Sequence, residues 1–297
     1  DDIAAAVLHA ATALGIEPIA SRLHRAAMAS TAASTAAPGA TSEPVGSIRR
    51  TNLLAVAGPD PTLAAELATG VAAGFSSHAA VMLVDLDLDR PIAPRLGLGI
   101  QPNLCDAVHT LRALHDARLA PFVASRAITT VQLPFAPLVG APSPQRQVEL
   151  TNTERSAVLH RATEQYDVVV ALADERRPTA DLPGAALAHC GLALVVVEAT
   201  PAALPALLDW LAALRSSTVD RTTDPVPVCV VTVGDVSRRR VESILDEIED
   251  CTRDLAVGAV GHLRLSARAH ARARWRGDLV RGSFARRCRA LVEEVSA

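Results

Sequence analysis

Apolar residues in this chain gather in short continuous runs, which are separated by longer stretches with helical spacing. Strands that are buried on both faces have this appearance, because neither face alternates with polar residues. The runs predict strands at residues 51–57, 80–85, 136–140, 167–172, 192–198, 226–232 and 256–260. The stretches between them predict helices near residues 61–75, 104–117, 152–165, 182–189, 201–214, 237–248 and 280–295.

The alternation of strands and helices predicts one kind of fold. Successive parallel strands need long crossover connections, and these are usually helices that cover both faces of the sheet. We therefore expect an α/β fold with a doubly wound, mostly parallel sheet. Ligands in such folds bind at the carboxyl ends of the strands, near the point where the strand order reverses. The loop after the first predicted strand is therefore the first place to look for a site.

The chain divides into three regions by composition. Residues 1–28 have helical spacing and are expected to form an N-terminal arm, or to be the remnant of a missing module. Residues 29–47 are small and polar and contain Pro and Gly, which is typical of a flexible linker. Residues 48–297 are expected to form one α/β domain.

The charged residues narrow the possible chemistry. The chain has 29 basic residues, all of them arginine, against 32 acids, and its net charge is −3. A chain without lysine cannot supply a phosphate-binding lysine, a Schiff base or a lysine general base. The apolar content of 49% excludes a disordered chain. The five cysteines are odd in number and form no C-x-x-C pair, so we expect free thiols and no structural zinc.

The first loop reads Gly58-Pro59-Asp60-Pro61-Thr62, between a predicted strand and a predicted helix. The next strand ends in Asp85-Leu86-Asp87, and Arg-Pro and Leu-Gly-Leu follow it. A Tyr-Asp-Val-Val-Val segment begins at residue 166. In this order, the motifs resemble the ParA/MinD family of deviant-Walker P-loop ATPases over about residues 50–295, and most closely the branch with the CpaE/TadZ pilus-positioning proteins. The resemblance implies a three-layer P-loop NTPase-like fold and a homodimer.

The first loop departs from the pattern of that family, which is K-G-G-x-G-K-T-T. Asp60 stands where the resemblance places the phosphate-binding lysine, and Pro61 stands where it places the magnesium-binding threonine. Pro59 replaces a glycine. Proline has no N–H to donate to a phosphate. A carboxylate about 4 Å from a phosphate charge is repelled by roughly 4 kcal/mol at an effective dielectric constant near 20. We therefore interpret residues 58–62 as a vestigial phosphate loop.

Two further positions of the family pattern are changed. Leu172 stands where the resemblance places the Walker B aspartate, and Asp174 would reach that place only after a shift in register. Thr232 replaces an asparagine on the adenine side. Asp85 and Asp87 remain. The resemblance would have one of them orient the attacking water, whereas the alternative is that they cap the strand end or the next helix. We expect no metal site there.

An arginine-rich segment near the end of the chain is its strongest electrostatic feature. Residues 264–289 contain nine arginines and one acid, a charge of +8, so the rest of the chain carries −3 − 8 = −11. The candidate contact residues are Arg264, Arg268, Arg272, Arg274 and Arg276. Three interpretations stay open, namely pairing with acids of the domain or a dimer mate, non-specific DNA contact, and contact with an anionic membrane or an acidic partner. Base stacking is poorly supported, because Trp275 is the one aromatic residue within the arginine run.

These observations predict a catalytically inactive pseudo-ATPase. It would be a cytoplasmic, dimeric scaffold that positions a pilus, secretion, septum or segregation machine through protein partners. We expect no cofactor and only indirect membrane contact, with recruitment to a membrane or cell pole by a partner. One alternative is an atypical ATPase that still binds ATP and Mg²⁺. The other is a partition-type protein that binds DNA through the arginine-rich segment.

Overall fold

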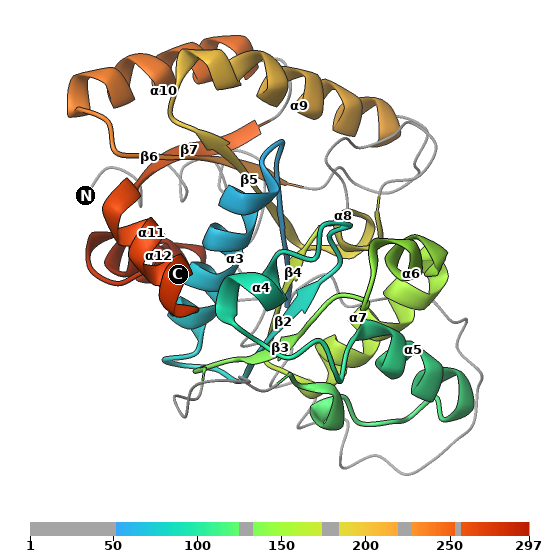
Figure 1. Ribbon diagram of the computed structural model, residues 1–297. Helices are drawn as coiled ribbons and strands as arrows, with labels where there is room; N and C mark the ends of the chain where they lie inside the picture. Colours follow the sequence, from blue (N-terminus) through green and yellow to red (C-terminus); the bar gives the residue numbers. More distant parts are fainter. Residues whose placement is uncertain (1–51, 125–132, 174–183, 219–226, 253–256, 297) are drawn as a thin grey trace.

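The computed structural model describes residues 52–124, 133–173, 184–218, 227–252 and 257–296 (Figure 1). The predicted arm at 1–28 and linker at 29–47 lie outside these ranges.

The described residues form a seven-stranded sheet in which every pair of neighbours is parallel. The order of the strands is β3-β2-β4-β1-β5-β6-β7. Their bounds are β1 Leu53–Ala57, β2 Val81–Asp85, β3 Ala136–Leu138, β4 Val168–Leu172, β5 Leu192–Glu198, β6 Val228–Gly234 and β7 Val257–Arg264. Each lies on a predicted run, which confirms the predicted fold class. The strand order reverses around β1, so the loop after β1 lies at the switch point.

The helices follow the predicted pattern with a few differences. Their bounds are α3 Pro61–Phe75, α4 Ile92–Leu96, α5 Leu104–Ala113, α6 Pro144–Glu149, α7 Asn152–Gln165, α8 Ala185–His189, α9 Leu204–Thr218, α10 Arg238–Thr252, α11 Ala267–Arg276 and α12 Ser283–Ser296. The short helices α4 and α6 were not predicted, because they have too few turns to show an apolar period. The helix α11 was not predicted as a separate element, since arginine occupies much of its surface.

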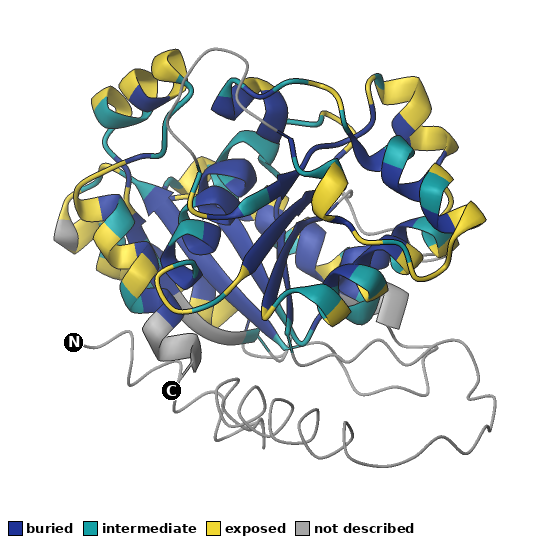
Figure 2. Ribbon diagram, turned by 90° about the horizontal axis from the view of Figure 1, so that it is seen from below, coloured by how far each residue is buried: buried dark blue, intermediate teal, exposed yellow. Residues whose placement is uncertain are grey.

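Two layers of helices bury the sheet between them. One apolar core joins the sheet to α5, α7, α8, α9 and α10, and the other joins it to α3, α4, α11 and α12. Figure 2 shows the strands as a buried band between the helical layers. The contact between α3 and α12 is close, because a Cβ added to Gly70 would lie 2.7 Å from Sγ of Cys288. Among the described residues, no helix combines the length and apolarity needed to cross a bilayer.

Candidate functional site

The loop after β1 is short and pressed against the neighbouring strand. Only Gly58, Pro59 and Asp60 connect β1 to α3. The motif of phosphate-binding loops, GxxxxGK[ST], places about six residues between the strand and the helix-opening lysine. A Cβ on Gly58 would lie 2.3 Å from the carbonyl oxygen of Val196 on β5, so glycine is required there by this close approach. The loop is therefore shorter than that motif and lies directly against β5.

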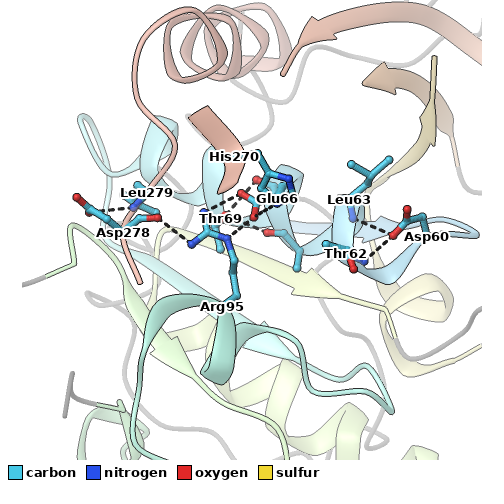
Figure 3. A network of polar contacts seen from close by, with 10 residues as sticks. Asp60, Thr62, Leu63, Glu66, Thr69, Arg95, His270, Asp278 and Leu279 are labelled. Carbon is cyan, nitrogen blue, oxygen red and sulfur yellow. Dashed lines mark hydrogen bonds and ion pairs between the residues drawn. The ribbon is translucent and has the colours of Figure 1, made fainter. Parts of the chain in front are cut away.

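The carboxylate of Asp60 binds the start of α3. One of its oxygens accepts hydrogen bonds from the backbone N–H of Thr62 at 2.8 Å and from that of Leu63 at 3.1 Å (Figure 3). An N-cap residue satisfies the unpaired N–H groups of a helix in this way. The same N–H groups, with the helix dipole, are what a helix N-terminus offers to a phosphate. The predicted phosphate loop therefore holds an anion of its own chain.

Asp85 and Asp87 lie at the carboxyl end of β2, and their carboxylates bind nearby backbone. Asp85 accepts from the N–H of Asp87 at 3.2 Å and from that of Ile92, the first residue of α4, at 3.0 Å. Asp87 accepts from the N–H of Asp89 at 2.7 Å. These contacts are the ones expected if the two carboxylates cap the strand end and the start of the next helix. Complete burial raises the pKa of Asp85 to about 8, although its two N–H donors act in the opposite direction.

Leu172 and Thr232, two further positions that the family pattern singled out, carry no carboxylate. Leu172 ends β4 and is fully buried, while Asp174 lies outside the described residues. Thr232 turns toward β7, where its hydroxyl donates to the carbonyl oxygen of Gly261 at 3.0 Å and lies 3.1 Å from Nδ1 of His262. Within the described part of the chain, no group of three or more His, Cys, Asp or Glu side chains could hold a metal ion.

A buried ionic cluster one turn further along α3 was missed by sequence reasoning. Glu66 is 1% exposed and forms a two-pronged ion pair with Arg95 of α4, in which Nη2 lies 2.9 Å from Oε2. Nε2 of His270 on α11 lies 3.0 Å from Oε1 of Glu66. Arg95 also donates to the carbonyl oxygen of Asp278 at 2.8 Å (Figure 3). The cluster therefore ties α3, α4 and α11 together.

Glu66 keeps its charge in this buried position. Burial raises its pKa, but hydrogen bonds from His270 and Arg95, together with their charges, outweigh burial and bring the pKa below its ordinary value. Glu66 could have been singled out from the sequence, because it is the one charged residue of helix α3. A lone acid on the core side of a helix needs a buried cation. Its partner could not be named from the sequence alone.

The five predicted arginine contacts lie around α11 and are all exposed. Arg264 ends β7 and pairs with Asp235 at 2.7 Å. This contact agrees with the first of the three interpretations, in which the arginines pair with acids of the domain. In the described part of the chain, no ion pair forms at Arg268, Arg272, Arg274 or Arg276. Trp275 lies among them on the same helix and is 86% exposed. The exposure of this large apolar side chain was not predicted.

Solved structures of other proteins show which known fold this chain has. No protein-family model matches the sequence, and no curated protein does. A ParA family ATPase from Chlorobium tepidum matches 82% of this chain and 97% of its own, with a TM-score of 0.63 and 13% identity. McdA from Cyanothece, solved as a single-residue variant in complex with ATP, matches 82% and 95%, with a TM-score of 0.57 and 13% identity. The MinC:MinD complex of Aquifex aeolicus gives a match with 82% and 94% coverage, a TM-score of 0.55 and 11% identity. This chain therefore has the α/β fold of the ParA and MinD ATPases.

Proposed function

We propose that this chain is a catalytically inactive member of the ParA/MinD family, in the branch with the CpaE/TadZ proteins. It would act in the cytoplasm as a dimeric scaffold that positions a pilus, secretion, septum or segregation machine through protein partners. The observation that carries the proposal is the contact of the Asp60 carboxylate with the N–H groups of Thr62 and Leu63. The shared fold with ParA, McdA and MinD supports a positioning role.

The physical argument concerns what a nucleotide would have to displace. A γ-phosphate at the start of α3 would compete with the carboxylate of Asp60. This carboxylate belongs to the chain itself and already accepts from the N–H groups there. The two prolines remove backbone donors, and the carboxylate opposes any phosphate that approaches. No lysine exists elsewhere in the chain to offset this repulsion. Because nucleotide would not gate assembly, dimer formation through this face would be constitutive or controlled by a partner.

Titration calorimetry with ATP and MgCl₂, together with a phosphate-release assay, tests the proposal. We expect neither binding heat nor turnover for the full chain. Asp60→Asn removes the charge but leaves the short loop and both prolines, so we expect it to bind no ATP either. Asp167→Asn is the matched control, because Asp167 caps the N–H of Ala80 at the opposite end of the sheet. Micromolar binding with turnover by the unmodified chain would establish the alternative, an atypical ATPase.

A further inference from the structure

The outward face of α11 carries an unusual combination of side chains. Arg268, Arg272 and Arg276 recur every four residues and are exposed, and Trp275 is 86% exposed between them. Residues four apart lie on one face of a helix. Trp and Arg are the residues most enriched at the energetic centres of protein interfaces. A large aromatic side chain left in water breaks the ordinary pattern of burial and marks a candidate interaction surface.

The inner face of α11 holds this surface in a fixed place. Ala273 is buried in the core, and His270 reaches the buried carboxylate of Glu66 at 3.0 Å. The residue after the helix, Gly277, adopts the left-handed conformation with φ of +59° and closes it. Just beyond, the carbonyl oxygen of Asp278 accepts from Arg95. The outward face is therefore preorganised, which lowers the entropy lost on binding a partner.

The chain itself carries a surface of complementary charge on α10. Residues 242–250 contain five acids and no base, and all five acids are exposed. Three of them, Glu242, Asp246 and Asp250, recur every four residues, which is the spacing of the three arginines on α11. The acids at the end of α10 oppose the helix dipole, which favours cations there.

We propose that α11 of one copy docks on α10 of a second copy of this chain, with the three arginines facing the three acids and Trp275 between the helices. The two helices lie at the same end of the sheet but in opposite layers, so they cannot meet within one molecule (Figure 1). The contact joins two different surfaces and is therefore heterologous, so that copies add one after another, in a closed ring or in an open row. This deepens the proposed scaffold function without depending on the nucleotide site.

A second copy fits this surface better than a nucleic acid or a lipid. A single tryptophan gives no platform on which successive bases could stack. Outside residues 264–289 the chain carries −11, so a long polyanion or an anionic membrane would be repelled beyond this arginine-rich segment. A helix with acids on successive turns of a second copy matches the arginines in both charge and spacing.

Sedimentation of the full chain at low and high salt tests the self-association. We expect the mass to rise with concentration beyond that of a dimer at about 0.05 M NaCl, and to fall back at about 0.5 M, because salt screens exposed charges. The basic-face variant Arg268→Gln/Arg272→Gln/Arg276→Gln and the acidic-face variant Glu242→Gln/Asp246→Asn/Asp250→Asn should each lose this growth. The variant Arg286→Gln/Arg287→Gln/Arg289→Gln removes the same charge from α12 and should keep it. Circular dichroism confirms that each variant is folded.

Mixing the two defective variants gives the sharpest test. The basic-face variant keeps its acids on α10, and the acidic-face variant keeps its arginines on α11. One intact contact can therefore form between them, and a fluorescent copy of one should sediment faster when the other is added. Trp275→Ala should weaken that association by about tenfold or more, as expected for an interface anchor.

Three results would overturn the inference. One is full-length protein whose mass does not grow with concentration at low salt. Another is growth in the unmodified chain while the two variants fail to associate on mixing. The last is an unmodified chain that does not assemble but binds random duplex DNA or phosphatidylglycerol vesicles, with loss of binding in the basic-face variant. That result would assign the surface to a polyanion. None of these results bears on ATP binding, so the two proposals fail independently.

Discussion

Glu66 and Asp85 are both buried carboxyl groups, with exposed fractions of 1% and 0%, yet their surroundings set their charge in opposite ways. Glu66 faces Arg95 and His270, which hold its pKa below the ordinary value. Asp85 has two backbone N–H donors, and Asp87 is a like-charged neighbour, so burial prevails and its pKa rises to about 8. A buried acid therefore stays charged where a cation pairs with it directly, and its pKa rises where its direct partners are backbone amides and a second carboxylate lies nearby.

The difference also separates two tasks within one fold. The ionised Glu66 joins three helices through Arg95 and His270, whereas Asp85 organises only the turn between β2 and α4. Neither carboxyl group is directed by the described contacts toward the loop after β1. At that loop, the acid in place is Asp60, which binds the N–H groups of its own helix.

The largest expected effect comes from removing the cation of the charged acid. Arg95→Met would leave Glu66 buried without its main partner, and we expect it to lower the free energy of unfolding by about 3–5 kcal/mol. Urea denaturation measures this loss. The double variant Glu66→Met/Arg95→Met removes both charges and should recover at least half of the loss. If the single and double variants were equally unstable, the pairing would not be the cause.

Sequence and structure agree most where burial is continuous. The strands and α3 were predictable. Continuous runs of Val, Leu and Ala are typical of strands that are buried on both faces, and Asp60-Pro61 is a typical start of a helix. The loop after β1 could be located for the same reason. The ionic cluster could not be predicted, because Glu66 and Arg95 are 29 residues apart and come together only through helix packing. The exposure of Trp275 likewise depends on which face of α11 the core covers.

Asp85 should make the protein less stable as the pH rises. Its folded pKa lies above its ordinary value of 3.8, so the unfolded state loses the proton first and stability falls between about pH 4 and pH 8. The slope for one such group is at most about 1.4 kcal/mol per pH unit. Asp85→Asn does not titrate, so its stability relative to the unmodified chain should increase over this range. Denaturation at pH 5 and pH 8 measures the change, and a constant difference would contradict the raised pKa.

Glu66 should show the opposite pH dependence. Because its folded pKa is lowered from 4.5, its contribution to stability is present above that pH and is lost as the pH falls through the folded pKa. Glu66→Gln should therefore be clearly less stable than the unmodified chain at pH 7, and the gap should narrow below about pH 4. Acid titration followed by circular dichroism gives the comparison. A gap that widened in acid would mean that Glu66 is protonated in the folded protein.

The smallest expected effect concerns Asp60, whose carboxyl group is only partly buried and needs no cation. Its contribution is the N-cap of α3, so Asp60→Ala should cost about 1 kcal/mol in the free energy of unfolding. Asp60→Asn keeps an oxygen that can accept from Thr62 and Leu63, and it should stay close to the unmodified chain. Urea denaturation of both variants separates the hydrogen bond from the charge. Equal losses in both would mean that the negative charge at the helix dipole matters more than the cap. In that case the start of α3 would favour an anion, and ATP binding by Asp60→Asn would be the measurement that decides whether this anion site still accepts a phosphate.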